Sequence, residues 1–281
     1  MSENVRITVL IENSVHRHGL VAEHGLSLHV QSGQQALLFD TGQSDLVLSN
    51  AKNLGVLLDS LTAVVLSHGH YDHTGGIPAI LNAATKARVY AHPAAFEMKY
   101  TGNSNSQSRF IGMSLQATQA IRRAPGGVVE TRGRTDILRG VFVTGEIPRL
   151  TPYEDTGGPF FLDAACTQPD LIRDDQSLVI DLGHSVVLLL GCAHAGVVNT
   201  LDHVQNLTGG KPVCAVIGGL HLGSASEERI QQTIARLRAA NLECLAPIHC
   251  TGWPATAQLW QAFPNICRPA GVGTVFEFKR D

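Results

Sequence analysis

The first third of the chain carries short apolar runs rich in β-branched residues, which is the pattern of buried strands. Strands are predicted at residues 7–11, 26–30, 36–39, 61–66 and 88–91. Two helices are expected among them. Asp45 can cap the first, which runs to Leu54 and ends at Gly55. The second covers residues 77–84, with Pro78 in its first turn.

In the last third, predicted strands and helices alternate regularly. Apolar runs indicate strands at residues 186–190, 213–217 and 244–248. Helices are predicted between them at residues 197–207 and 227–240. The second helix places Ile230, Ile234 and Leu237 on one face. This alternation is typical of an α/β protein.

Residues 93–175 behave differently, because glycine, proline, asparagine and serine interrupt the pattern, as at residues 101–106 and 152–159. Long irregular segments inside compact domains usually form lids or binding loops. We therefore expect residues 93–175 to form part of a cap over a binding site, with a core strand at residues 140–144. The whole chain, residues 1–281, is expected to form a single domain.

The highest density of potential metal-binding side chains follows the strand predicted at residues 61–66. There His68, His70, Asp72 and His73 are arranged as His-x-His-x-Asp-His. Open α/β sheets place their ligands at such strand ends. In an extended chain, His68 and His70 project to one side and can hold one cation, while a turn carries Asp72 and His73 to a second position. Imidazole suits zinc, iron and nickel, and carboxylate also suits manganese.

Three more histidines, His194, His221 and His249, each close a predicted apolar strand. One strand-end histidine is usually a hydrogen-bonded loop residue. Three at successive strand ends, in a chain with a metal loop at the same rim, indicate that they belong to the site. The remaining histidines lack this context.

With these motifs, the sequence resembles the metallo-β-lactamase superfamily. Residues 37–42 are similar to its first strand-end signature, and residues 191–196 and 247–252 lie where later ligands are expected. The segments at residues 23–26, 67–76, 191–200, 217–222 and 247–252 together resemble the subgroup named for 7,8-dihydropterin-6-methyl-4-(β-D-ribofuranosyl)aminobenzene-5'-phosphate synthase. This resemblance includes His24. It implies a four-layer αββα sandwich, in which helices flank two mixed sheets.

The resemblance also implies roles for individual residues. The metal ligands would be His68, His70, Asp72, His73, His194 and His249. Asp40 would hold a ligand histidine from behind, and Asp72 would also act on the attacking water. His221 is predicted to donate a proton to the leaving group, with metal ligation as its rival role. Arg109, in the cap segment, is a candidate for binding a substrate phosphate or carboxylate.

The sequence departs from the superfamily pattern at two ligands. Most members have a histidine before the penultimate core strand, but here that position falls near residues 173–177, which contain no histidine. Most members have an aspartate that bridges both metals, but here the strand ends in Gly191-Cys192-Ala193-His194, without an aspartate. His194 would then serve one metal, and Cys192 or Asp175 are candidates for the missing carboxylate. The second metal position is expected to be weaker or to hold a different ion, because fewer anionic ligands offset its charge.

Composition and charge limit the kinds of partner and compartment that are expected for this chain. Apolar residues make up 44% of the chain and charged residues 16%, which suits a large core. The net charge is −3 and no basic run is present, so a nucleic-acid partner is not expected. Residues 1–6 do not resemble a signal peptide, and no apolar run has membrane-spanning length. We therefore expect a soluble cytoplasmic protein with a small-molecule substrate and no membrane partner.

Three functions follow from these patterns. The first is a metal-dependent hydrolase that acts on a phosphoester, a phosphodiester or a cyclic ester. The second is a transferase that condenses a dihydropterin diphosphate with an aminobenzene riboside phosphate. The third is a ligand or metal sensor without catalysis. Each would use one or two divalent transition-metal ions, with zinc favoured and manganese or iron as alternatives.

Overall fold

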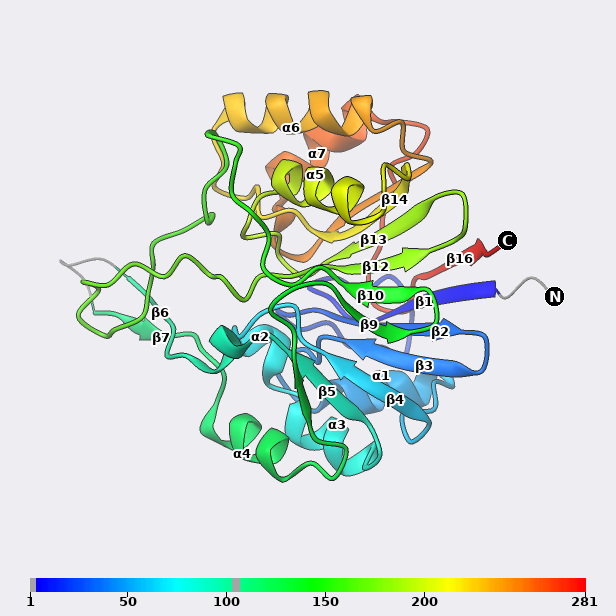
Figure 1. Cartoon of the computed structure of the whole chain (residues 1–281), viewed down its shortest axis with the longest axis vertical. Coiled ribbons are helices and arrows are strands. Elements are labelled where there is room, and N and C mark those ends of the chain that lie inside the picture. Colours follow the sequence, from blue (N-terminus) through cyan, green and yellow to red (C-terminus); the bar gives the residue numbers. More distant parts are fainter. Residues whose placement is uncertain (1–3, 103–106) are drawn as a thin grey trace.

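Two β-sheets packed face to face form the centre of the molecule, and helices cover both outer faces (Figure 1). The computed structural model describes residues 4–102 and 107–281. Residues 103–106 of the predicted irregular stretch and residues 1–3 of the N-terminal segment lie outside the described residues. The predicted αββα sandwich with two mixed sheets is confirmed.

The first sheet has seven strands in the order β16-β1-β2-β3-β4-β5-β8. The strands up to β3 pair antiparallel, and those from β3 to β8 pair parallel. Their bounds are β1 Asn4–Ile11, β2 Ser27–Ser32, β3 Gln35–Phe39, β4 Leu61–Val65, β5 Arg88–Ala91, β8 Val128–Glu130 and β16 Val275–Lys279. The helices α1 (Leu46–Leu54), α3 (Ile77–Ala83) and α4 (Leu115–Arg123) pack on its outer face.

The second sheet has six strands in the order β15-β14-β13-β12-β10-β9. The three strands β13, β14 and β15 run parallel, so their carboxyl ends meet at one edge. The bounds are β9 Thr135–Leu138, β10 Val141–Val143, β12 Leu178–Asp181, β13 Val186–Leu190, β14 Val213–Gly219 and β15 Cys244–Ile248. The helices α5 (Val197–Leu207), α6 (Glu227–Ala239) and α7 (Trp253–Ala262) cover it.

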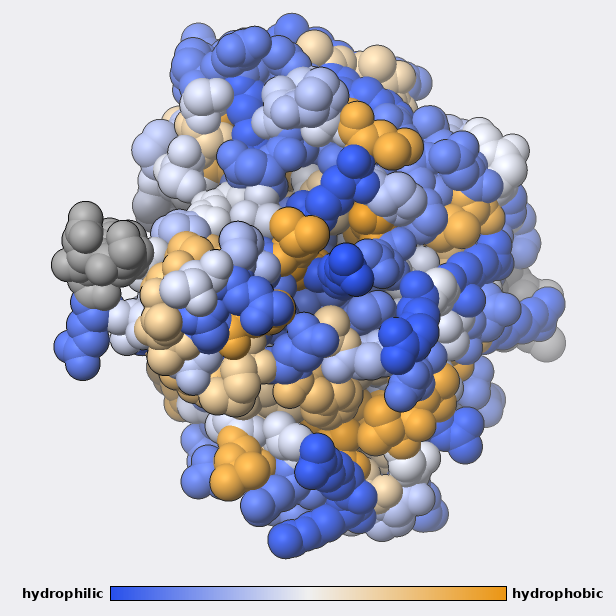
Figure 2. Space-filling model, turned by 60° about the vertical axis from the view of Figure 1, so that its left-hand side comes forward, coloured by the Kyte–Doolittle hydropathy of each residue, from blue (hydrophilic) through white to orange (hydrophobic). Residues whose placement is uncertain are grey.

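Alternation along the strands divides the core into three apolar layers. Leu37 and Phe39 of β3 point between the sheets, whereas Leu38 points toward the helices. Both faces of each sheet are therefore buried, as expected for central parallel strands. On the face turned forward in Figure 2, apolar groups are scattered among polar ones.

The segment 93–175 contributes to several layers. The strand β8 joins the first sheet, and β9 and β10 join the second. A separate three-stranded sheet combines β6 (Tyr100–Thr101), β7 (Arg109–Phe110) and β11 (Phe160–Phe161). The strands β6 and β7 project to the left of the sandwich in Figure 1. The cap role of this segment stays a prediction.

Two local expectations are wrong. Asp45 stands at the start of α1, but its side chain makes no capping hydrogen bond. The Ser44 hydroxyl accepts from the backbone N–H of Leu46 instead. The predicted turn at Asp72 and His73 is a short helix, α2 (Tyr71–Thr74). Within the described ranges, no helix is both long and apolar enough to cross a membrane.

Candidate metal centre

The metal loop leaves the carboxyl end of β4, where Asp40 at the end of β3 supports it. Because β3 and β4 pair in parallel, Asp40 lies beside Ser67. One carboxylate oxygen accepts from the Ser67 backbone N–H at 2.7 Å. The other accepts from the Ser67 hydroxyl at 2.6 Å and from His73 Nδ1 at 2.7 Å. The buried Asp40 therefore has the placement that its predicted supporting role requires, although that role stays a prediction.

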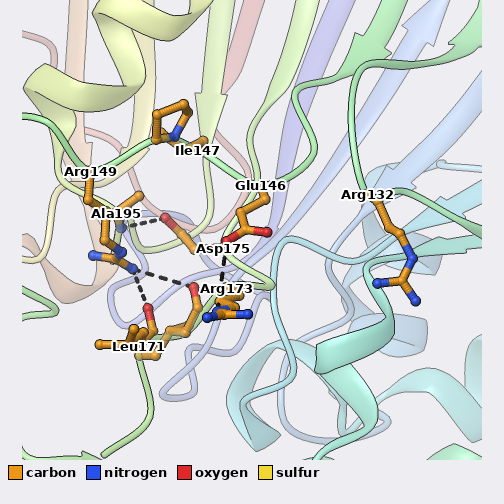
Figure 3. Close-up of a pocket in the computed structure, with 10 residues that line it drawn as sticks. Arg132, Glu146, Ile147, Arg149, Leu171, Arg173, Asp175 and Ala195 are labelled. Carbon is orange, nitrogen blue, oxygen red and sulfur yellow. Dashed lines mark hydrogen bonds and ion pairs between the residues drawn. The ribbon is translucent and has the colours of Figure 1, made fainter.

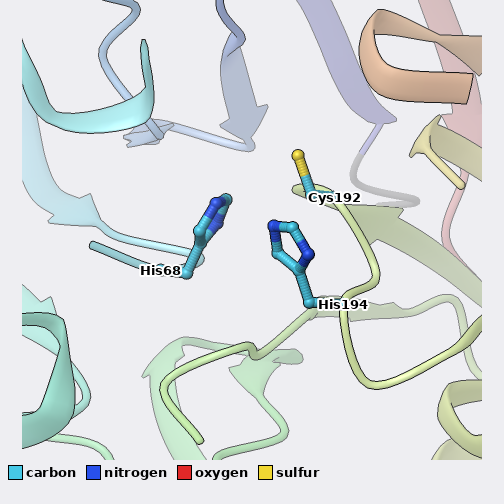
Figure 4. A group of neighbouring side chains, drawn as sticks. All are labelled: His68, Cys192 and His194. Atoms are coloured by element: carbon cyan, nitrogen blue, oxygen red, sulfur yellow. The ribbon is translucent and has the colours of Figure 1, made fainter. Parts of the chain in front are cut away.

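His68, His70 and His194 form the first histidine group. Their ring centroids lie 4.5–5.0 Å apart. His194 Nδ1 donates to the carbonyl of Thr156 at 2.8 Å, so Nε2 carries a lone pair. That Nε2 atom and His70 Nε2 are buried and have no hydrogen-bond partner. Figure 4 shows the rings of His68 and His194 turned toward each other.

His68 is also held in one tautomer. The Ser67 hydroxyl donates to Asp40, so it accepts from His68 Nδ1 at 2.9 Å. The lone pair on His68 Nε2 then lies 2.9 Å from His70 Nδ1. Convergent lone pairs in a buried place are the donor set that a transition-metal ion needs.

Asp72, His73 and His249 form the second group. The Nε2 atoms of His73 and His249 lie 3.1 Å apart. His73 Nδ1 donates to Asp40, and His249 Nδ1 donates to Asn13 Oδ1 at 3.1 Å. The two Nε2 atoms therefore face each other, with either a proton or a cation between them.

His24 joins this second group, and its ring lies beside that of His249. Its Nε2 is 3.2 Å from an Asp72 carboxylate oxygen, which is 3.4 Å from His249 and 3.7 Å from His73. The side chain of His24 is 54% exposed. No ligand role was predicted for His24, because only the subgroup resemblance drew attention to it.

Cys192 lies between the two groups. Its sulfur is 3.3 Å from His73 Nε2 and is within ligand distance of His68 and His194 as well (Figure 4). Asp175, the other candidate for the missing carboxylate, accepts from the Ala195 backbone N–H at 2.7 Å. Burial raises the pKa of Asp175 to about 6. Of the two candidates, Cys192 has the central place.

The last two predicted site residues lie at different distances from the centre. The His221 ring centroid is 4.3 Å from that of His194, so His221 lies at the centre. Its two predicted roles, proton donor and ligand, are both untested. Arg109 is exposed on β7, with its guanidinium 5.8 Å from the ring centroid of Tyr71. Its role in substrate binding also stays a prediction.

The electrostatics separate the two groups. Burial holds the pKa of His68 and of His194 well below the usual value and lowers that of His70 to about 3. These imidazoles are therefore neutral, as ligation requires. Burial would also lower the pKa of His73, but the charges of Asp40 and Asp72 outweigh it and raise that pKa to about 9.

The pKa of Asp72 is also displaced. Burial would raise it, but the charge of His73 and hydrogen bonds from His24 and His249 hold it well below its usual range. The Asp72 side chain is therefore an ionised carboxylate. Together with His73 and His249, it supplies an anionic ligand to the second group.

A buried ion-pair network fixes the back of the metal loop. Lys99 Nζ lies 2.9 Å from Asp170 and 2.8 Å from Asp174, and Lys99 is 1% exposed. The second carboxylate oxygen of Asp174 accepts from the Gly69 backbone N–H at 2.7 Å. Gly69 stands between the candidate ligands His68 and His70, so Asp174 links the loop to the 93–175 segment. This network could not be predicted from the sequence, because its members are far apart in the chain.

A cavity of about 500 Å³ lies beside the loop that carries His194, with Ala195 in its lining (Figure 3). Arg132, Arg149 and Arg173 line it beside Asp175. Arg149 donates to the backbone carbonyls of His194, at 2.6 Å, and of Leu171. The cavity thus shares a wall with the loop that carries a candidate ligand.

Comparison with known proteins gives a consistent result. The profile of the Metallo-beta-lactamase superfamily matches residues 22–159. The crystal structure of Tm1679, described as a metal-dependent hydrolase of the beta-lactamase superfamily, is 30% identical, with a TM-score of 0.82 over 98% of this chain and 99% of that one. The crystal structure of the metallo-beta-lactamase fold protein YhfI from Bacillus subtilis is 16% identical. Its TM-score is 0.60 over 98% of this chain and 100% of that one.

A curated relative carries a different description. The 7,8-dihydropterin-6-methyl-4-(beta-D-ribofuranosyl)-aminobenzene-5'-phosphate synthase of Methanocaldococcus jannaschii is 28% identical over 98% of this chain and 97% of its own length. One full-length relative is thus described as a hydrolase and another as a synthase.

Proposed function

Because this chain belongs to the metallo-β-lactamase superfamily, we propose that it is a metal-dependent hydrolase that acts on a phosphoester, a phosphodiester or a cyclic ester of a small molecule. The observation that carries the proposal is the 3.1 Å approach of His73 Nε2 and His249 Nε2, whose Nδ1 atoms are both engaged elsewhere. A cation placed there would bind both Nε2 atoms. The Nε2 atoms of His70 and His194, which are buried and have no hydrogen-bond partner, offer two further ligand atoms.

The residues present fit one or two divalent transition-metal ions, with zinc favoured. His68, His70 and His194 would hold one ion, and Asp72, His73 and His249 the other. Such ions lower the pKa of water and polarise the bond under attack. Three protein ligands to an ion leave a position for water or substrate, as in catalytic zinc sites.

The chain's own groups orient the reaction. Asp40 and the Thr156 carbonyl fix the tautomers of His73 and His194. The Asp72 carboxylate can accept a hydrogen bond from the attacking water and orient it. His24, which is partly exposed, closes the open side of the second group.

The cavity beside His194 supports a substrate that carries a phosphate or a carboxylate. Arg132 and Arg173 are exposed at its rim, and their glutamate partners lie at 3.4 and 4.0 Å. Exposed pairs of this kind are weak, so an anionic substrate can displace them. Arg109 on β7 is a second candidate for the same group.

A transferase is the second candidate function. It is favoured by the likeness to the M. jannaschii synthase over 98% of this chain, at 28% identity. In that case the centre would bind a departing diphosphate, and an amine would replace water as the nucleophile.

The test combines metal analysis with a substrate screen. Full-length protein, stripped with a chelator and reloaded with zinc or manganese, is assayed on phosphodiesters, phosphomonoesters and lactones. We expect turnover of one of these classes in water, lost on stripping and also lost in His194→Ala. The matched control is His184→Ala, because His184 is exposed and its ring pairs with Asp281, outside the candidate metal groups.

Three outcomes would contradict the hydrolase proposal. Full activity after stripping would exclude a role for metal. Diphosphate release that requires an added amine would favour the transferase. Metal binding without turnover in any class would favour a sensor.

A further inference from the structure

We propose that Cys192, His221 and Cys250 form a third cation position, beside the two histidine groups, that binds a soft divalent ion such as zinc or cadmium through two thiolates and one imidazole. The two sulfur atoms and one ring nitrogen lie within 4.8 Å of one another. The proposal does not depend on hydrolysis and goes beyond the proposed function.

The topology of the second sheet brings these three residues together. The parallel strands β13, β14 and β15 are adjacent, with Leu190 opposite Gly218 and Gly219 opposite Ile248. Each of the three residues leaves its strand two or three positions beyond such a pair. The carboxyl ends of three neighbouring parallel strands therefore present a thiol, an imidazole and a thiol side by side.

Gly219 makes room for this cluster. A Cβ atom at Gly219 would lie 2.5 Å from the Cys250 sulfur and 3.4 Å from the Cys192 Cα. Any larger residue would push Cys250 away from Cys192. The absence of a side chain on the middle strand is thus what lets the two cysteines approach each other across it.

His221 is held in place for ligation. Its Nδ1 is buried and has no hydrogen-bond partner. Its backbone has a φ of +46°, which is uncommon for a residue other than glycine. Gly157 lies against the ring, and a Cβ there would come within 2.0 Å of it. A fixed ring with an unsatisfied buried nitrogen suits a ligand better than a mobile proton donor.

The donor set separates this position from the other two. Thiolates select soft or borderline ions, and two cysteines with one histidine hold the catalytic zinc of alcohol dehydrogenase. Among the described residues, His221 and Cys250 occur in this group alone, whereas Cys192 also lies within reach of both histidine groups. Cys250 and His221 are therefore the residues that test the third position.

The experiment is a Cd²⁺ titration of the reduced, metal-stripped full-length protein. The ultraviolet charge-transfer absorption of cadmium–thiolate bonds reports the sulfur ligands, and mass spectrometry reports the stoichiometry. We expect Cys250→Ser and His221→Ala each to lose one equivalent of cadmium. Both variants should also lose the thiolate absorption of that equivalent, because the ion that forms the cadmium–thiolate bonds is no longer bound. Gly219→Ala should reproduce the loss with all three ligands intact.

Two matched variants keep the result specific. Cys267→Ser removes a thiol outside the described metal-ligand groups and should change neither readout. The double variant His68→Ala/His70→Ala should lose a different equivalent and keep the thiolate absorption, so failure of the histidine groups is distinguishable from failure of this position. Wild-type stoichiometry and absorption in Cys250→Ser would overturn the proposal. So would a Cys192–Cys250 disulfide that persists under reducing conditions.

Discussion

Divided by where its candidate ligands lie in the sequence, the metal centre has two halves, and these are built in different ways. The first half is the loop of residues 67–74, in which four candidate ligands follow one strand, and the buried Asp40 carboxylate accepts hydrogen bonds from Ser67 and His73. The second half collects His194 and His249 from separate strand ends, and neutral oxygens of Thr156 and Asn13 hold them. The first half is thus encoded locally and supported by charge. The second depends on the assembled sheet, and its imidazole rings donate to neutral oxygens.

The largest effect should come from the locally encoded half. In His68→Ala/His70→Ala, two of the three nitrogen donors of the first group are lost, so the protein should bind one metal ion fewer. Mass spectrometry of the purified variant measures this, with His184→Ala as the exposed-histidine control. Unchanged metal content in the double variant would remove the basis for treating this loop as a ligand loop.

A smaller effect should distinguish charged from neutral support. Replacing Asp40 by asparagine removes the charge behind His73 and should weaken metal binding by about 10–100-fold, the usual cost of losing such a partner. Asn13→Ala removes only a neutral acceptor from His249 and should cost less. Competition titrations with a chromophoric chelator measure both. A larger loss in Asn13→Ala would reverse the comparison.

The smallest effect concerns a buried histidine outside both halves. Burial and the nearby Arg6 lower the pKa of His29, on β2, to about 4. The unfolded chain, with a histidine pKa near 6.5, therefore binds more protons between pH 6.5 and 4, and stability falls as the pH drops through this range. The loss by pH 5 should be about 1–2 kcal/mol.

Urea unfolding at pH 7 and pH 5 measures this loss. The pH dependence should shrink in His29→Gln, whereas His16→Gln serves as the control at an exposed position. An equal pH dependence in wild type and His29→Gln would show that His29 is not buried in its neutral form.

The difference between a locally encoded loop and a part assembled from separate strands also explains what could be predicted from the sequence. Strand bounds were predicted to within a residue or two where apolar runs were uninterrupted, as at 186–190 and 244–248. The metal loop could be predicted because its candidate ligands lie within six residues of the sequence. Asp40 was found only through its resemblance to a known signature, since nothing local connects it to His73.

Other features depend on contacts that no local pattern records. The sheet of β6, β7 and β11 joins strands of two residues each, too short for a hydrophobic period. The strand β12 and the helix α7 were not predicted either. The central place of Cys192 and the nearness of Cys250 follow from strand order, because their separation in sequence carries no sign of contact.

The buried Lys99 has a consequence for access to the centre. Drawing β6 away from the metal loop would separate Lys99 from Asp174 and leave charges unpaired, at a cost of about 3–5 kcal/mol. At equilibrium, on the order of one molecule in a thousand would then be open on this side. A substrate that needed this opening would bind with an apparent affinity reduced by about the same factor. Substrate exchange on another side of the centre breaks no such ion pair and is therefore energetically favoured.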